Sequence, residues 1–319
     1  MKRIAYFYLF LFPFLAYSQG IQLRDSLDGS AVSFATISFG DGLGTFADED
    51  GHFLFSKSKY SDVDTLFISA MGYANKSVAV HSGLGTILLQ PEVSQLSEVI
   101  LSAPKLGKYR IRKQKAGTHK DIFSCWLPTV ESEVAVFFER YENKATQITQ
   151  LLLPINAETD YKSKGKGKFA TLFRIQFYDN DNDLPGKQIP YEEVVFAISD
   201  DEDKEFELDL AEKSIFIPEN GLYVSLQVLG YANERGRLAE TKKYREIKTA
   251  RGIQKISTSF RPLLPFSKGL PQQKTYVRRI FLNHKKWQVF DRSYNENSKL
   301  IQSGHRNYNM GAEFKVYED

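Results

Sequence analysis

The sequence lacks most of the residues that would cross-link a small fold or build a common hydrolytic centre. Its 319 residues contain one cysteine, Cys125, so no internal disulfide can form, and we expect this residue to be a small buried hydrophobe. None of the five histidines begins a His-x-x-Glu or His-Glu-x-x-His motif, the signatures of zinc peptidases. A Gly-x-Ser-x-Gly nucleophile elbow is also missing. We therefore predict a non-enzymatic protein with no catalytic residue and no cofactor.

Strong net charge and long apolar runs are scarce as well. The formal charge is +3, and it falls to +1 when Lys2 and Arg3 of a predicted leader are left out. So small an excess excludes the general basic field that attracts nucleic acid, and we expect no nucleic-acid partner. Beyond residue 18 no stretch is long and apolar enough to cross a bilayer, so we expect no membrane span in the mature chain.

The first eighteen residues are the exception, because two basic residues precede an unbroken apolar run over residues 4–16. Ala16 and Ser18 stand at the −3 and −1 positions of a cut before Gln19, as in a secretory signal peptide. A transmembrane anchor is the alternative, but a helix of 13 apolar residues is about 20 Å long, against about 30 Å of hydrocarbon. We predict cleavage of residues 1–18 and export to the periplasm or outer membrane, with the cell surface as an alternative.

Short strand-like runs separated by turn residues follow, up to about residue 90. Periodicity of the helical kind is missing there, and the candidate strands are 31–39, 51–55, 64–73, 76–80 and 85–90. Roughly six or seven short strands in so short a stretch predict a small antiparallel sandwich.

Residues 48–51, Asp-Glu-Asp-Gly, allow three interpretations: a calcium loop, a carboxylate cluster or a turn. If Gly51 were the sixth position of an EF-hand loop, Phe46 would be the first ligand and Lys57 the twelfth, and neither offers a carboxylate. A hairpin turn needs only what is present, because Asp bonds its own backbone and Gly adopts a positive φ. We predict a hairpin turn.

Three motifs in this region resemble the carboxypeptidase regulatory-like domain: GTFADEDGHFLF (44–55), LFISAMGYANKSV (66–78) and LSEVILSAP (96–104). The matching residues are Asp48, Gly51, Phe53, Ile68, Ser69, Gly72, Tyr73, Leu96, Glu98 and Val99, whereas Ala47 replaces the usual Thr. The resemblance implies a transthyretin-like, seven-stranded sandwich over residues 19–104 of an exported protein of gram-negative bacteria. It does not imply peptidase activity. Similar domains precede the plug of TonB-dependent transporters.

The segment 105–120, KLGKYRIRKQKAGTHK, carries seven Lys or Arg residues and no acidic residue. Such a run is typical of a solvated connector, and it could also contact an anionic envelope surface. Because it has no apolar helical face, we predict a basic connector between two domains.

Residues 121–319 predict a second and larger β unit. Its candidate strands are 133–140, 146–155, 170–179, 192–200, 205–210, 214–218, 221–230, 274–282, 286–293 and 312–318. This series predicts a jelly-roll-like β-sandwich, which makes the whole protein all-β. The unit resembles, through residues 173–189 and 217–230, a domain of undefined function that often follows the regulatory-like module.

Two groups of residues are candidates for ligand contacts. Asp179, Asp181 and Asp183 alternate as calcium ligands do, although Leu184 occupies the sixth position and a polar turn explains the same residues. The acidic segment 199–210 is a weaker calcium candidate. Trp287, Phe290 and Tyr294, and also Tyr308, could stack on a sugar, but most aromatic residues in strands are core residues.

We therefore expect a non-catalytic, exported cell-envelope protein that acts as a binding or structural module through its sandwich surfaces. Its partner would be an envelope protein or a glycan. Two alternatives remain: an accessory component of a TonB-linked uptake system, and a glycan-binding or glycan-processing protein. Two carboxylates converging in a cleft would be the sign of glycan processing.

Overall fold

The computed structural model describes residues 19–81, 83–92, 107–158, 168–250, 252–269, 274–282 and 286–318. The predicted signal peptide and the motif at 96–104 lie outside these residues. Strands dominate the described part, and its one α-helix is α1 (Lys299–Gln302). The all-β fold class is confirmed. In the described part of the chain, no helix has the length and apolar character needed to cross a membrane.

The N-terminal sandwich, residues 19–92, contains seven strands in two sheets, as predicted. They are β1 (Gln19–Asp25), β2 (Thr36–Gly40), β3 (Leu43–Phe46), β4 (His52–Phe55), β5 (Thr65–Ser69), β6 (Lys76–Ala79) and β7 (Thr86–Leu89). The sheet orders are β4-β1-β7 and β3-β2-β5-β6. Alternate residues of each strand face a shared core, for example Ile21 and Leu23 of β1 and Leu66 and Ile68 of β5. One pairing, β1 with β7, is parallel, which the purely antiparallel prediction missed.

The acidic segment 48–51 is a turn, but it is not a hairpin turn. Strand β3 lies in one sheet and β4 in the other, so the turn carries the chain across the sandwich. The Asp48 carboxylate accepts hydrogen bonds from the backbone N–H of Asp50 at 3.0 Å and of His52 at 2.7 Å. Gly51 has a φ of 76°, and a Cβ there would lie 2.6 Å from the carbonyl oxygen of Leu23. The hairpin prediction is therefore wrong, because a local turn signal does not say which strands pair.

The C-terminal sandwich, residues 107–318, contains the remaining strands. They are β8 (Tyr109–Gln114), β9 (Cys125–Trp126), β10 (Ser132–Phe138), β11 (Thr146–Pro154), β12 (Ala170–Asp181), β13 (Leu184–Gln188), β14 (Val194–Ser199), β15 (Glu205–Asp209), β16 (Ile215–Phe216), β17 (Leu222–Tyr231), β18 (Tyr244–Thr249), β19 (Gly252–Ser257), β20 (Leu264–Pro265), β21 (Thr275–Arg279), β22 (Gln288–Val289) and β23 (Gly311–Tyr317). A seven-stranded sheet has the order β13-β12-β17-β10-β21-β22, with β14 also paired to β12. A five-stranded sheet has the order β15-β11-β23-β8, with β16 also paired to β11.

The core of this sandwich lies between its two sheets. Val134, Val136 and Phe138 of β10 face the same core as Leu151 and Leu153 of β11 on the opposite sheet. Both strands lie where the sequence predicted candidate strands, but residues between these positions are also buried, as Leu152 is, so neither strand is half-buried.

Part of the predicted basic connector belongs to this sandwich instead. Strand β8 pairs antiparallel with β23 along its whole length, from Tyr109 opposite Tyr317 to Gln114 opposite Ala312. Its side chains are nearly all exposed, so the sequence carried no alternation from which an edge strand could be predicted.

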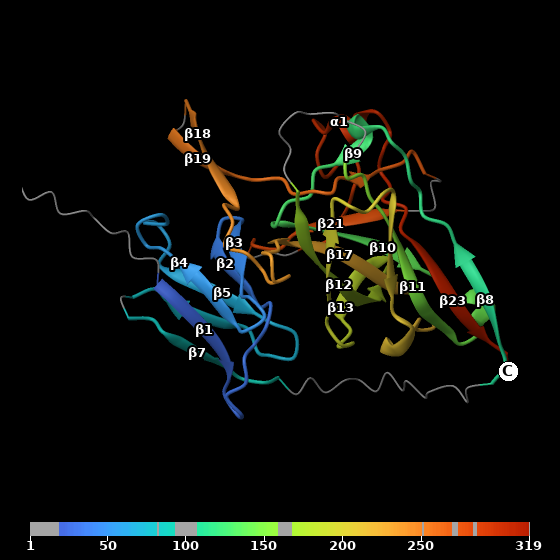
Figure 1. Ribbon diagram of the computed structural model, residues 1–319, viewed down its shortest axis with the longest axis horizontal. Coiled ribbons are helices and arrows are strands. Elements are labelled where there is room, and N and C mark those ends of the chain that lie inside the picture. Colours follow the sequence, from blue (N-terminus) through green and yellow to red (C-terminus); the bar gives the residue numbers. More distant parts are fainter. Residues whose placement is uncertain are drawn as a thin grey trace, which may run out of the picture.

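One hairpin departs from the compact sandwich. Strands β18 and β19, for which the sequence predicted only a polar connection, pair with each other and reach over the N-terminal sandwich (Figure 1). This arm contributes one wall of the site described next.

Candidate binding groove between the two sandwiches

The two sandwiches share a packed junction centred on strand β3. The Phe46 ring, which ends β3, is buried in the core of the C-terminal sandwich, with its centroid 5.5 Å from that of Phe281. The Arg174 guanidinium lies over the same ring at 5.5 Å. The Ser38 hydroxyl donates to the carbonyl of Phe281, and the Tyr244 hydroxyl bonds both the N–H and the carbonyl of Gly44. The junction thus combines apolar packing with fixed polar contacts.

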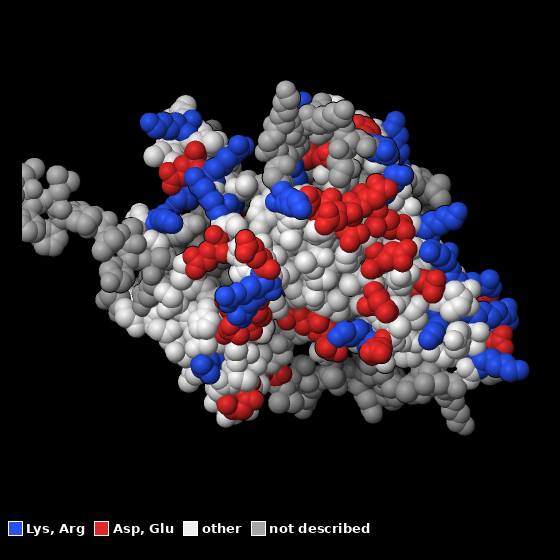
Figure 2. Space-filling view, viewed as in Figure 1, with Lys and Arg blue, Asp and Glu red and all other residues white. Residues whose placement is uncertain are grey.

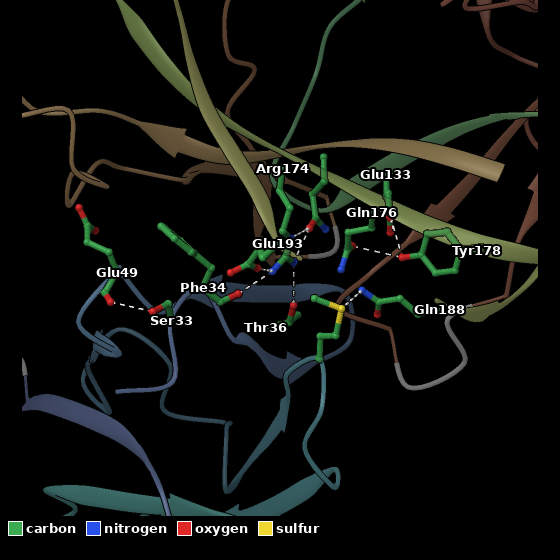
Figure 3. A network of polar contacts seen from close by, with 12 residues as sticks. Ser33, Phe34, Thr36, Glu49, Glu133, Arg174, Gln176, Tyr178, Gln188 and Glu193 are labelled. Carbon is green, nitrogen blue, oxygen red and sulfur yellow. Dashed lines mark hydrogen bonds and ion pairs between the residues drawn. The ribbon is translucent and has the colours of Figure 1, made fainter. Parts of the chain in front are cut away.

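Arg174 of β12 makes the most extensive of these polar contacts. Its guanidinium donates to the carbonyl of Phe34 at 2.7 Å and to the hydroxyl of Thr36 at 3.4 Å in the N-terminal sandwich (Figure 3). Within its own sandwich it donates to Gln227 and forms an ion pair with Glu193 at 3.2 Å. Burial raises the pKa of Glu193, an effect that Arg174 partly offsets. A buried arginine with all its partners present sets the position of one sandwich against the other.

A second buried polar cluster lies farther along the same sheet face. Glu133 of β10 accepts hydrogen bonds from the Tyr178 hydroxyl at 2.9 Å and the Ser225 hydroxyl at 2.6 Å. It also forms an ion pair with Arg278 at 2.7 Å, and Arg278 donates to the Tyr178 hydroxyl as well. Figure 3 shows Glu133 and Tyr178 beside the Arg174 contacts. Both carboxylate oxygens of Glu133 are engaged in protein contacts, so the cluster connects neighbouring strands of the sheet.

The acidic turn has a partner in the C-terminal sandwich. Arg237 forms ion pairs with Glu49, at 2.8 Å, and with Asp50. The turn therefore contributes to the junction, with its carboxylates directed at an arginine.

A groove opens beside this junction, between the N-terminal sandwich and the β18 arm, with a volume of about 720 Å³. One wall comes from β3, β4 and Tyr60, and the other from residues 238–246 and Lys255. Its charged lining residues are Lys59, Lys242, Lys243, Arg245, Lys255, Asp48, Glu240 and Glu246. Basic residues outnumber acidic ones, and Figure 2 shows Lys and Arg side chains gathered around the β18–β19 arm. The groove is large enough for a small ligand or a short segment of a polymer.

Lys243 is the most unusual residue of the groove. Its ammonium donates to the Thr45 hydroxyl at 2.5 Å and lies 5.9 Å from the centre of the Phe46 ring. Burial lowers the pKa of Lys243 to about 8, and the charge of Glu240 opposes this shift only in part. Among the described residues it forms no ion pair, so hydrogen-bonding capacity of the ammonium remains for an anion in the groove.

The calcium candidates Asp179, Asp181 and Asp183 lie on a hairpin, in agreement with the polar turn that was the other interpretation of these residues. Asn182 and Asp183 adopt φ of 52° and 61° between β12 and β13, as in a type I′ turn. The Asp179 carboxylate accepts the backbone N–H of Lys187 at 2.5 Å, and Asp181 accepts the side-chain amide of Asn182. Across the described residues, no three His, Cys, Asp or Glu side chains come together in a way that could hold a metal ion.

The predicted stacking residues do not form one surface. Phe290 is 4% exposed and packs against Trp126 and Phe266, so it is a core residue and the stacking prediction is wrong for it. Tyr294 packs against Phe290, and burial raises its pKa. Trp287 is half-buried between Tyr178 and Arg278, whose guanidinium lies 4.5 Å from the ring centre. Tyr308 is buried as well.

Cys125 is buried as expected, and burial raises the pKa of its thiol to about 12. The group therefore stays protonated at physiological pH and is a poor nucleophile.

Sequence reasoning missed the residues that build the junction, above all Arg174, Arg237 and Lys243. Alternation placed Arg174 on the polar face of its strand, which ordinarily faces water. Nothing in the sequence indicated that a second sandwich covers that face.

Comparison with known proteins adds no relative to this picture. No family model, no curated protein and no solved structure matches the chain. The function therefore has to be inferred from the site itself.

Proposed function

We propose that the protein is an exported, non-catalytic binding protein of the cell envelope that holds an anionic ligand in the groove between its two sandwiches. The observation that carries the proposal is the position of Lys243, a cation that lines the groove with a hydroxyl partner and without an ion pair among the described residues. A carboxylate, sulfate or phosphate group would supply the missing charge-assisted contact. Export and envelope location come from the signal-peptide pattern and the family resemblance.

The junction supports this proposal, because a binding site between two domains needs walls that hold their spacing. Arg174, Arg237 and Tyr244 each connect the two sandwiches beside the groove. A groove of fixed width loses little conformational entropy when a ligand enters. An accessory role in TonB-linked uptake stays a prediction from resemblance alone, while glycan binding fits the groove if the glycan is acidic.

The test is calorimetric titration of the mature protein with oligogalacturonate and with a polyglutamate peptide, beside a neutral oligosaccharide of equal length. We expect an anionic probe to bind and Lys243→Met to weaken binding by roughly tenfold, since a hydrogen bond to a charged group contributes about 1.5–3 kcal/mol. Lys248→Met, an exposed lysine of the same arm that does not line the groove, and Arg237→Met, which alters the junction but does not line the groove, are the matched controls.

The pH dependence gives a second readout. A bound anion stabilises the charged form of Lys243 and therefore raises the pKa of this residue. In the ligand-free protein the pKa of Lys243 is about 8, so the affinity for the anion should fall as the pH rises through this value. Equal losses in all three variants, or binding of the neutral sugar alone, would contradict the proposal.

A further inference from the structure

The five-stranded sheet of the C-terminal sandwich ends in two edge strands. In the order β15-β11-β23-β8, strand β15 pairs only with β11 and strand β8 only with β23, among the described residues. An edge strand presents unpaired backbone N–H and C=O groups, which can add a strand from another chain.

The two edges carry opposite charge. Strand β8 and its flanks contain Lys108, Arg110, Arg112, Lys113 and Lys115 without an acidic residue. Strand β15 contains Glu205, Glu207 and Asp209, and it follows an acidic loop with Asp200, Asp201, Glu202 and Asp203. Figure 2 shows basic side chains along the margin where Figure 1 labels β8, and acidic ones over the middle of the same face.

Much of the basic edge is available to a partner. Arg110 pairs with Glu318 at 2.8 Å and Arg112 lies 3.7 Å from Glu142, whereas Lys113 and Lys115 are exposed and form no ion pair among the described residues. Ile111 is 49% exposed in the same strand and adds apolar surface to this edge.

Strand direction allows the β8 edge of one copy to pair with the β15 edge of another copy. Each step from β15 to β11, from β11 to β23 and from β23 to β8 is antiparallel, so β15 and β8 run in opposite directions. If β8 of one copy lies beside β15 of the next, the antiparallel alternation continues without a break.

The side-chain faces also match. Phe206 and Leu208 lie opposite Leu153 and Leu151, which places them on the core face of the sheet and the β15 carboxylates on the outer face. On β8, the outer face carries Tyr109, Ile111 and Lys113, because Ile111 lies opposite the outward Lys315. In such a pairing Lys113 would contact the carboxylates of β15. The aliphatic parts of Arg110 and Arg112, on the other face of β8, would cover Phe206 and Leu208.

We propose that the protein assembles head to tail with further copies of itself, through β8 of one copy and β15 of the next. Charge selects this arrangement, because two β8 edges or two β15 edges repel each other and a closed two-fold dimer through either edge is disfavoured. Unlike edges attract, so the contact repeats from copy to copy.

The test is sedimentation equilibrium of the full mature protein over a range of concentrations, at about 0.02 M and about 0.5 M salt. We expect the mean mass to rise with concentration at low salt and to return to the monomer at high salt. Two charge-reversal variants follow: Lys113→Glu with Lys115→Glu on β8, and Glu205→Lys with Glu207→Lys on β15. Each alone should stay monomeric, whereas Lys187→Glu with Lys248→Glu, two exposed lysines away from both edges, should behave as the unaltered protein.

The decisive sample is an equal mixture of the two edge variants. Each edge then meets an opposite charge on the other variant, so assembly should return to at least half of the mass increase of the unaltered protein. A protein that stays monomeric at low salt, a mass that stops at a dimer, or a mixture that stays monomeric although circular dichroism shows both variants folded would overturn the proposal.

Discussion

At the scale of single residues, Glu133 is the position where we expect a substitution to affect the stability of the fold strongly. Its side chain is fully buried, and it is the counter-ion of Arg278, whose side chain is 16% exposed. Removing one partner of a buried ion pair leaves the other charge in a medium of low dielectric constant, which costs far more than the pair contributes. The sequence shows only a glutamate within an apolar strand, so this dependence is visible only in the structure.

We therefore predict that Glu133→Gln lowers the free energy of unfolding by about 3 kcal/mol, because the amide cannot neutralise Arg278. Urea unfolding followed by tryptophan fluorescence measures this. Glu219→Gln is the matched control, since Glu219 is 92% exposed and pairs with Arg140 at 3.4 Å, and it should change stability by less than about 0.5 kcal/mol. Similar losses for both variants would show that Glu133 is not the counter-ion on which the sheet depends.

At the scale of elements, the turn between β3 and β4 shows how one glycine permits a change of sheet. Gly51 has a positive φ, and a Cβ at this position would lie only 2.6 Å from the carbonyl oxygen of Leu23. Gly29 offers a matched comparison in the same sandwich, because it has a φ of 75° and no atom lies within 4 Å of the place that a Cβ would take. The two sites separate the cost of backbone strain from the cost of crowding.

Gly29→Ala should destabilise the protein by about 1 kcal/mol, the cost of a left-handed backbone for a residue with a Cβ. Gly51→Ala should cost about 2–3 kcal/mol, because the methyl group also meets the Leu23 carbonyl. Circular dichroism during urea unfolding compares the two midpoints. If the losses are equal, the close approach at Gly51 has no energetic weight.

At the scale of the whole molecule, the junction makes two sandwiches into one body. Phe46 belongs to the core of the sandwich opposite its own, and Arg174 contacts both sides. Both tryptophans, Trp126 and Trp287, lie in the C-terminal sandwich. Tryptophan fluorescence therefore reports that sandwich alone, while far-ultraviolet circular dichroism reports both.

We predict that the two signals give coincident unfolding transitions in the unaltered protein, since a strongly coupled pair of domains unfolds as one unit. Arg174→Met should lower stability by about 2–3 kcal/mol, because the side chain of Gln227 and the carbonyl of Phe34 lose their buried donor, and should separate the two transitions. Separate transitions before any substitution would mean that the junction does not couple the sandwiches.

The strand positions were largely predictable from the sequence, and the partners of the strands were not. Apolar runs bounded by turn residues located β10, β11 and β17 within a few residues, and alternation of apolar and polar residues located β12 and β15. It failed for β8 and for the β18–β19 arm, whose side chains are mostly exposed on both faces and therefore show no period of two.

The sequence by itself determined the all-β class, most strand positions and the presence of a turn at residues 48–51, since each depends on neighbours within one strand or turn. Only the tertiary structure decided that this turn changes sheets, that Arg174 and Glu133 are buried, and that Lys243 lines a groove. The physical reason is that alternation shows which residues share a face of a strand, whereas the burial and charge of that face depend on the distant segment that covers it.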